Sequence, residues 1–378
     1  MNRRVAFLLL LFGLLLAGCA SASAPAQPTS QEPQPIPAAP TVDASQLVQL
    51  LPRDALPSID DPLFISADQA DANPDEMKPD ERVIGLVIDG DARAYPLNIL
   101  SNHEIVNDTV GNQPVAVTWC PLCYSALVFS REVADADEPL TFGVSGMLLQ
   151  NTLVMFDRQT GSLWSQLYGA AIDGPLAGTS LSFFPSTLTD WTTWRTQHPD
   201  TRVLSKQATR EQFNRPSYSE SPRTSYAVDA YASYYAMPDE GVVNSHIPRE
   251  AGDRGPKRRV LGVRNGDAAR AYPFATLAEE QVVNDELAGL PLLVWFDPAS
   301  QTARAYERRV DGRVLTFALA ADDAGELADA ETASRWNPLT GQAVEGPLAG
   351  ARLTPLLATT AFEFGWVGYF PESDMYGE

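Results

Sequence analysis

The chain has 378 residues, of which 44% are hydrophobic, and 48 acidic against 27 basic side chains give it a net charge of −21. Such an acidic excess excludes nucleic-acid binding as the general role, because phosphate backbones bind basic surfaces. The apolar content and length suffice for about two folded domains.

The chain begins with a pattern typical of a secretion signal. Arg3 and Arg4 precede a short apolar run, which is too short to span a bilayer as a helix. The run ends in Leu-Ala-Gly followed by Cys19, which resembles the lipobox of bacterial lipoproteins. This resemblance implies cleavage after residue 18 and a diacylglycerol on the Cys19 sulfur; an ordinary signal peptide with an incidental cysteine is the alternative. We therefore expect a lipid-anchored protein that faces the periplasm or the exterior, with the bilayer as its partner.

Residues 19–45 are rich in Ala, Pro, Ser, Gln and Thr. Segments of this composition bury too little apolar surface to fold, so we predict a disordered tether. No later stretch is long and apolar enough for a transmembrane helix.

The remainder of the chain contains an internal duplication, which sets its domain organisation. Repeated motifs recur in order at offsets that fall from 177 to 172 residues: Arg-Val-Ile/Leu-Gly, Ala-Tyr-Pro, Val-Asn-Asp, Leu-Thr-Phe, an Asp/Thr/Ser/Trp pattern and Gly-Pro-Leu-Ala-Gly. We divide the chain into a first copy at residues 46–208, a Tyr-rich connector at 209–247 and a second, degenerate copy at 248–378.

Each copy reads chiefly as short strands. In the first copy, β-branched and aromatic runs bounded by turn residues predict strands at 83–88, 92–95, 115–119, 126–129, 140–144 and 153–156. Short helices are predicted around 97–106, 188–197 and 277–283. The expected fold is mainly β, as a sandwich or partly closed barrel, with α+β as the alternative.

Comparison of the copies separates shared residues from those found in one copy only. Residues present in both copies, such as the Val-Asn-Asp and Ala-Tyr-Pro motifs, are interpreted as scaffold. His103 faces Glu280, Cys120 faces Asp297 and Cys123 faces Ser300. The imidazole and the two thiols are therefore confined to the first copy.

The Cys120-Pro121-Leu122-Cys123 motif allows three interpretations. Two thiolates with His103 as a third ligand suit Cu(I) or Zn(II), with water, Met147 or a carboxylate as the fourth. A thiol–disulfide site would use a solvent-exposed Cys120 as the attacking sulfur, although no helix clearly begins there. The third interpretation is an inert disulfide that closes a tight loop. Glu104, Met147 and Arg158 are predicted to line a pocket, as is Gln166.

Several of these motifs in order, including His-Glu-Ile-Val-Asn-Asp from His103 and Leu-Val-Met-Phe-Asp-Arg-Gln-Thr from Leu153, resemble a family of bacterial and archaeal exported proteins. That family is known as a domain of unknown function, DUF3179. The resemblance covers nearly all of the chain after the tether and implies that His103, Cys120 and Cys123 belong to the family pattern. It implies no activity.

Three functions follow as hypotheses. The first is a membrane-anchored metal-binding lipoprotein that holds Cu or Zn through Cys120, Cys123 and His103. The second is a thiol–disulfide oxidoreductase that uses the two cysteines, the sole catalytic motif available. The third is a binding or scaffold protein that uses the Tyr-rich connector from Tyr218 to Tyr235 as a contact surface, with no partner identified by the sequence.

Overall fold

The computed structural model describes residues 32–134, 136–213, 226–238, 240–243, 257–321 and 323–378. Strands make up 43% of the structure and helices 15%, which confirms the predicted mainly β fold, and the sheets of the described part form no closed barrel. The predicted signal peptide and Cys19 lie outside the described residues. Within those ranges, none of the helices has the length and apolar character needed to cross a bilayer.

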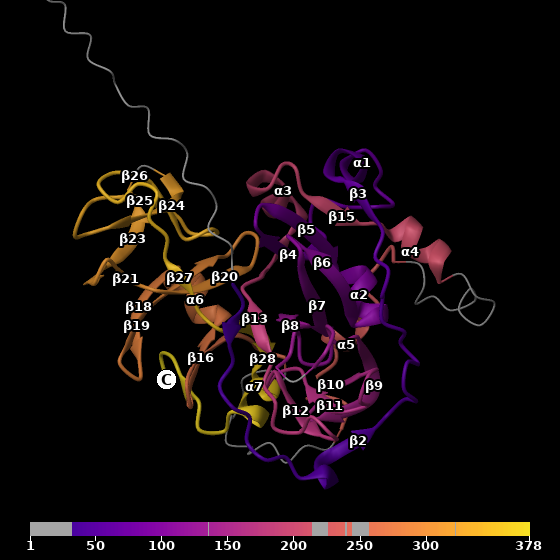
Figure 1. Cartoon of the computed structure of the whole chain (residues 1–378). Helices are drawn as coiled ribbons and strands as arrows, with labels where there is room; N and C mark the ends of the chain where they lie inside the picture. Colours follow the sequence, from indigo (N-terminus) through magenta and orange to yellow (C-terminus); the bar gives the residue numbers. More distant parts are fainter. Residues whose placement is uncertain (1–31, 135, 214–225, 239, 244–256, 322) are drawn as a thin grey trace, which may run out of the picture.

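The first copy is built from three sheets of five strands each (Figure 1). One sheet runs in the order β1 (Gln34–Pro35), β13 (Ser182–Phe184), β8 (Ser125–Ser130), β7 (Gln113–Cys120), β6 (Ile105–Val110). The second runs β12 (Ala170–Asp173), β11 (Leu163–Ser165), β10 (Thr152–Asp157), β9 (Phe142–Leu149), β2 (Leu47–Gln49). The third runs β14 (Thr187–Asp190), β4 (Arg82–Ile88), β5 (Asp91–Pro96), β15 (Arg202–Leu204), β3 (Phe64–Ser66).

The second copy repeats these sheets with fewer strands. Two of its sheets are β28 (Ala358–Phe362), β16 (Arg259–Asn265), β17 (Ala268–Pro273), β29 (Asp374–Met375) and β18 (Val282–Leu287), β19 (Leu290–Asp297), β20 (Thr302–Glu307), β27 (Thr354–Pro355). The third is β23 (Phe317–Ala320), β24 (Asp323–Asp329), β25 (Arg335–Asn337), β26 (Gln342–Glu345). A separate hairpin pairs β21 (Arg309–Val310) with β22 (Arg313–Val314).

The helices are short and lie between or beside the sheets. The described helices are η1 (Ala44–Gln46), α1 (Ala67–Asp71), α2 (Leu97–His103), α3 (Trp191–Gln197), α4 (Lys206–Gln212), α5 (Ala232–Tyr235), α6 (Phe274–Glu280) and α7 (Glu363–Tyr369). The helices predicted around 97–106, 188–197 and 277–283 are confirmed as α2, α3 and α6.

Side chains shared by the two copies make the same contacts in each. Asp157 accepts a 2.9 Å hydrogen bond from the Trp164 indole, and the second copy repeats it between Asp329 and Trp336 at 2.9 Å. The Tyr95 hydroxyl likewise donates to Asp108, as Tyr272 donates to Asp285. These buried bonds satisfy polar groups of the cores, in agreement with a structural role.

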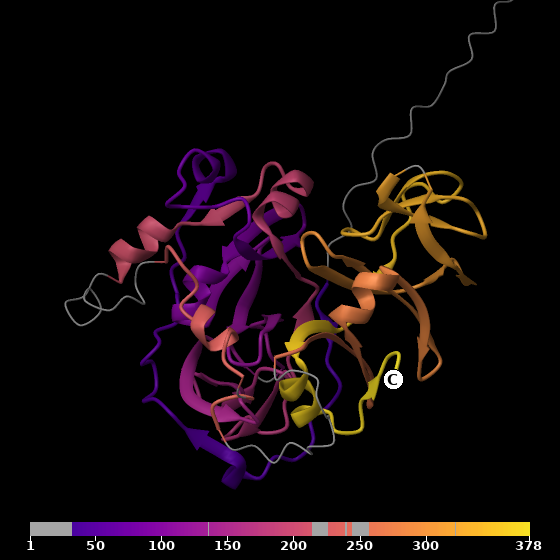
Figure 2. The ribbon, with the colours of Figure 1, turned by 180° about the vertical axis from the view of Figure 1, so that it is seen from behind.

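The two copies pack against each other through equivalent elements (Figures 1 and 2). Strand β8 of the first copy contacts β28 of the second, and β20 of the second copy contacts β14 of the first. Since β8 corresponds to β20 and β14 to β28, the contact follows an approximate twofold relation. Phe362 and Phe364 of the second copy lie within a core cluster of the first.

One prediction for the amino-terminal tether is wrong within the described residues. Gln34 and Pro35 pair with Phe183 and Ser182 of β13, and the neighbouring Ile36 is buried. The edge of β13 offers unpaired backbone groups, and Ile36 occupies the space beside Gly169, so this short segment gains hydrogen bonds and apolar burial. The predicted disorder therefore does not extend to residue 45.

Candidate functional site

Cys120 and Cys123 lie at the tip of a β-hairpin. Strand β7 ends at Cys120, β8 begins at Ser125, and these two residues pair across the ladder. Tyr124, between Cys123 and Ser125, adopts a left-handed conformation with φ 59°, which turns the chain back into β8. No helix begins at either cysteine, as the sequence predicts.

Both cysteines are buried, with exposed fractions of 2% for Cys120 and 0% for Cys123. The expectation that Cys120 is solvent-exposed is therefore wrong. Segments distant in sequence cover the turn. The Tyr234 hydroxyl of α5 donates a 2.8 Å hydrogen bond to the Leu122 carbonyl, and α7 approaches so closely that a Cβ added at Gly365 would lie 2.8 Å from Cys123 Cβ.

The two thiols interact and differ in acidity. Burial raises the pKa of Cys120 well above its usual range, and the hydrogen bond between Cys120 and Cys123 raises it further. Burial also works to raise the pKa of Cys123, but hydrogen bonds from Cys120, Ser125 and Thr152 outweigh it and lower this pKa. Cys123 is thus the sulfur that more readily becomes a thiolate, with Cys120 as its hydrogen-bond donor.

A chain of buried polar side chains continues from Cys123 into the first copy. The Cys123 sulfur lies 3.0 Å from the Ser125 hydroxyl, which donates to Gln166 at 2.7 Å. The Gln166 amide in turn donates to the Thr118 hydroxyl at 3.0 Å. Because Ser125 has one hydroxyl proton, either Gln166 or a Cys123 thiolate can accept it. When Cys123 becomes a thiolate, the network can therefore donate a hydrogen bond to it without a change in the backbone.

Glu104 supplies a titratable group beside the thiols. It follows α2 in a left-handed conformation, and its carbonyl accepts a 2.8 Å hydrogen bond from the Trp119 amide of β7. Its side chain is 7% exposed. Burial, and then the charge on Cys123, raise the pKa of the Glu104 carboxyl to about 8. A carboxyl group with such a pKa can exchange protons near neutral pH.

His103 is directed to other partners. Its Nδ1 lies 2.7 Å from the Pro57 carbonyl, which can only accept, so Nδ1 carries the proton. Nε2 lies 2.6 Å from the Tyr226 hydroxyl, which therefore donates to it. Burial lowers the pKa of His103 to about 4, against the effect of the Pro57 hydrogen bond. The imidazole is neutral at pH 7, and both of its nitrogens are occupied.

The other predicted pocket residues are dispersed. Arg158 forms ion pairs with Asp54 at 2.8 Å and Asp60 at 3.6 Å. Met147 of β9 is half-buried against the core cluster that contains both cysteines. Gln166 does belong to the thiol network. Among the described residues, no group of three or more His, Cys, Asp or Glu is placed to hold a metal ion.

Residues that sequence reasoning missed complete the site. Ser125 and Thr118 bind Gln166, and Tyr226 binds His103. Differences between the copies could have indicated some of these site residues, since the second copy has Trp295 opposite Thr118 and Gln281 opposite Glu104. The Tyr226 contact joins residues 123 apart, and no local pattern indicates it.

The equivalent turn of the second copy shows what the hairpin requires structurally. The Asp297 carboxylate accepts hydrogen bonds from the amides of Ala299 at 3.0 Å and Ser300 at 3.2 Å, and the Ser300 hydroxyl donates to the same carboxylate. Ser300 also contacts the Thr302 hydroxyl at 2.7 Å, as Cys123 contacts Ser125. An ordinary aspartate turn is therefore enough to close this hairpin. The cysteines are not needed for its shape.

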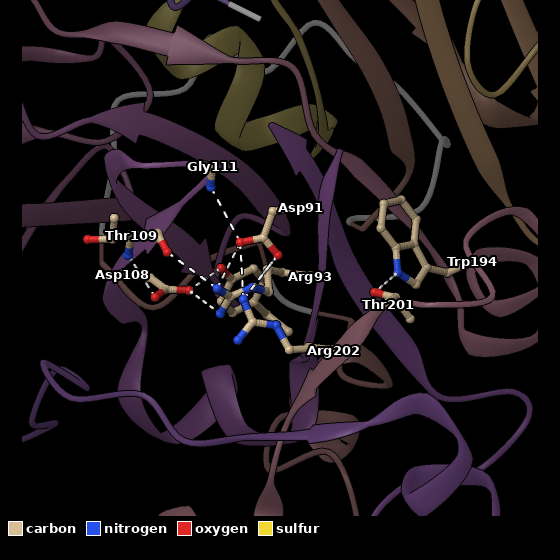
Figure 3. Close-up of polar contacts among 9 residues, drawn as sticks. Asp91, Arg93, Asp108, Thr109, Gly111, Trp194, Thr201 and Arg202 are labelled. Atoms are coloured by element: carbon tan, nitrogen blue, oxygen red, sulfur yellow. Dashed lines mark hydrogen bonds and ion pairs between the residues drawn. The ribbon is translucent and has the colours of Figure 1, made fainter. Parts of the chain in front are cut away.

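A second polar cluster, around Arg93, is scaffold rather than a site (Figure 3). Arg93 bridges Asp91 at 2.9 Å and Asp108 at 3.5 Å, and Arg202 of β15 approaches Asp91 at 3.1 Å. Arg270 and Asp285 form the matching pair in the second copy at 2.6 Å. A contact present in both copies serves their common fold.

Fold and site together define a duplicated, mainly β protein with one buried dithiol site in its first copy. A family model described as "Protein of unknown function (DUF3179)" matches residues 53–373, and the chain belongs to this family. No curated protein and no solved structure matches the chain significantly.

Proposed function

We propose that the chain is an exported, lipid-anchored thiol–disulfide redox protein whose Cys120–Cys123 pair alternates between dithiol and disulfide. The observation that carries the proposal is the placement of two free, buried thiols at one hairpin tip, where the Cys123 sulfur lies 3.0 Å from the Ser125 hydroxyl; hydrogen bonds lower the pKa of Cys123 and burial raises that of Cys120. The second copy closes the same turn without cysteines. The thiols of the first copy therefore need an explanation other than folding.

The chemistry is an exchange with a disulfide of another molecule. The Cys123 thiolate attacks one sulfur of that disulfide, a mixed disulfide forms and the partner's other sulfur leaves as a thiolate. Cys120 then loses its proton and attacks the Cys123 sulfur, which releases the partner's second sulfur. The pair ends oxidised, and the partner disulfide is reduced to two thiols.

Glu104 is the proton acceptor in this scheme. Because the pKa of Cys120 is high, this thiol needs a base near the pair when it attacks. The Glu104 carboxyl group interacts electrostatically with both Cys120 and Cys123. The ionised form of this carboxyl group, which becomes the main form above pH 8, takes that proton, and the carboxylic acid returns it in the reverse direction.

Redox titration tests the proposal. The protein is equilibrated in buffers of defined ratios of reduced to oxidised dithiothreitol or glutathione, and alkylation with peptide mapping distinguishes Cys120 and Cys123 from Cys19. We expect a reversible loss of two hydrogens confined to the 120–123 peptide. The matched control is the double variant Cys120→Asp/Cys123→Ser, which installs the turn of the second copy and should fold without the redox transition. Thiols that stay reduced in every buffer, or a disulfide that resists dithiothreitol, would refute the proposal.

Metal binding is the second candidate, favoured by two adjacent sulfurs with a buried carboxyl group nearby. Cu(I) or Zn(II) would take Cys120 and Cys123, and His103 could join only by releasing Tyr226. Elemental analysis after loading with either metal and dialysis tests it in the wild type, Cys120→Ser and His103→Ala. Binding lost in both variants would support the three-ligand site, and binding lost only in Cys120→Ser would support a site without His103. Unchanged stoichiometry in both variants would exclude either site.

The anchor is a separate part of the proposal and rests on the sequence around Cys19. Metabolic labelling with palmitate and membrane fractionation test it. We expect label in the wild type and none in Cys19→Ser. An unlabelled wild type would leave an exported protein without a lipid.

A further inference from the structure

A cavity lies between the two copies, away from the thiol pair. It encloses about 370 Å³, and first-copy residues Pro185, Trp194 and His198 and second-copy residues Arg304, Arg352 and Leu353 contribute to its walls. Pockets of this size at an interface between folded units commonly bind small molecules, and the wall here combines apolar side chains with polar and charged ones, among them the Asp89 carboxylate.

The two guanidinium groups in this wall lack carboxylate partners in the described part of the chain. Arg304 donates to the Ser186 carbonyl at 2.5 Å and to the hydroxyls of Thr187 at 3.0 Å and Tyr306 at 3.1 Å. Arg352 donates to the Gln342 amide oxygen at 3.0 Å. Every one of these acceptors is neutral. The Asp89 carboxylate also lines the cavity but forms no ion pair with Arg304 or Arg352, so this wall carries two guanidinium groups against one carboxylate in a chain whose net charge is −21.

His198 and Trp194 form the aromatic part of the wall. Their rings lie 4.1 Å apart between centroids, and the Trp194 indole is fixed by a 3.0 Å hydrogen bond to Thr201 (Figure 3). Neither ring nitrogen of His198 has a partner within the described ranges. The wall therefore presents a flat ring with free hydrogen-bonding groups beside the two arginines.

The duplication shows that these polar residues are not part of the common scaffold. Leu127 stands opposite Arg304, Ser180 opposite Arg352 and Phe370 opposite His198. At the equivalent place on the other side of the molecule, the rings of Phe370 and Tyr168 lie 5.8 Å apart, and Arg264 lies over Phe370. Aromatic side chains fill that side, whereas His198 and Thr340 leave the cavity open on this one.

We propose that this cavity binds a small organic anion. Arg304 and Arg352 take its charged group, because guanidinium groups match the geometry of carboxylate oxygens. The apolar remainder lies between Pro185, Leu353 and the His198–Trp194 pair. This site is independent of the thiol chemistry, so either proposal can fail without the other.

Isothermal titration calorimetry with the reduced full-length protein tests the site, with benzoate and hexanoate as probes. Benzyl alcohol is the uncharged analogue, and inorganic phosphate is the anion without an apolar part. We expect one site for a carboxylate probe, with at least tenfold weaker binding of both benzyl alcohol and phosphate. If benzyl alcohol bound as tightly as the carboxylates, the proposed role of the arginines would be wrong. If phosphate bound as tightly, the proposal that the ligand is organic would be wrong. No binding of either carboxylate would overturn the proposal.

Two variants locate the binding. Arg352→Gln removes an exposed guanidinium that donates a hydrogen bond to Gln342, so folding should be unaffected, and we expect at least a tenfold loss of affinity. Arg313→Gln is the control, since it removes the same charge from the exposed hairpin of β21 and β22. Equal affinity in the wild type and both variants would place the probe elsewhere and refute the site.

Discussion

Glu104 and Gln281 occupy equivalent positions in the two copies with nearly the same backbone, at φ 57° and 59°. Each carbonyl accepts a hydrogen bond from the opposite strand, from Trp119 at 2.8 Å and from Phe296 at 2.9 Å. An amide of the same shape is therefore compatible with this position. The single difference is the proton that Glu104 can gain or lose, so Glu104→Gln isolates that property.

We predict that Glu104→Gln changes the pH dependence of stability. The carboxyl titrates near pH 4.5 when unfolded and near 8 when folded, so folding takes up a proton between these values. The wild type gains its stability from the protonated form below pH 4.5 and loses it as pH rises through 8. At pH 7 the variant should exceed the wild type by about 3 kcal/mol, and at pH 4 the two should agree.

Chemical denaturation of reduced protein at pH 4, 6 and 8 measures this difference. Glu279→Gln, an exposed change on α6, serves as the control and should shift stability little at any pH. A wild-type minus variant difference that does not vary with pH would show that Glu104 titrates normally.

For individual residues, the sequence predicts which of them differ between the two copies better than it predicts where their side chains point. Cys120 and Cys123 do lie together, and they stand out because the second copy lacks them. Glu104, predicted only as a pocket residue, interacts with the charge on Cys123. His103 is equally unusual, yet the Pro57 carbonyl and Tyr226 hydroxyl hold its ring. Those partners come from a loop and from the connector. Their positions depend on tertiary packing, which no local pattern contains.

The element that covers the thiol pair is α5, a helix of four residues in the connector. Tyr234 binds the Leu122 carbonyl, and the Tyr235 ring lies 5.4 Å from Tyr124 and 5.8 Å from Phe362. One turn of helix cannot be stable by itself, so these contacts hold it in place. Access to the sulfurs therefore depends on how often α5 leaves the turn.

We predict that Tyr234→Phe speeds the reaction of the thiols with a small alkylating reagent. The change deletes the hydrogen bond to Leu122, worth about 1 kcal/mol, which corresponds to roughly a fivefold higher population of the open form. Rates of iodoacetamide labelling at Cys120 and Cys123, read by mass spectrometry, check it. Tyr376→Phe, which loses a hydrogen bond to Glu280 at the edge of the second copy, should leave the rate unchanged.

Elements were the most predictable level of this fold. The strands at 83–88, 92–95 and 126–129 are confirmed within one residue at either end as β4, β5 and β8. Runs of β-branched and aromatic residues bounded by turn residues indicate such strands locally in the sequence. Gln34–Pro35 was not predicted to be a strand, since its two residues pair only because β13 presents a free edge. The burial of the thiols was missed for the same reason, as α5 and α7 arrive from distant parts of the sequence.

The whole molecule is held together by reciprocal contacts between the copies, and one of them reaches the site. Thr359 of β28 donates to the Ala126 carbonyl at 3.0 Å, three residues from Cys123, while Arg304 of β20 donates to Thr187 of β14. The Phe362 amide also donates to the Cys123 carbonyl at 2.7 Å. The second copy thus forms one wall of the thiol site.

We predict that Gly365→Ala weakens this wall. The added methyl would lie 2.8 Å from Cys123 Cβ, so α7 or the turn must move, at a cost of about 1–3 kcal/mol. Thermal unfolding should show the loss, and thiol labelling should become faster.

Gly368→Ala in the same helix is the matched control for that change. Its added methyl would meet Gln150 Cβ at 3.4 Å, and alanine favours a helix over glycine by about 1 kcal/mol. The control should be neutral or slightly stabilising. Equal destabilisation by both substitutions would mean that the packing of α7 against the turn at Cys123 does not contribute to stability.

The placement of Gly365 over Cys123 has a consequence for how the duplicated halves depend on each other. The second copy, which has no cysteines at this turn, shields the two cysteines of the first copy. A mutation that destabilises the second copy would therefore make the sulfurs of the first copy oxidise faster. By the reciprocity of linked equilibria, a disulfide that alters the hairpin tip must loosen or tighten the docking of the other half by the same free energy. The oxidation state of the two sulfur atoms would then change the stability of the whole interface between the two copies.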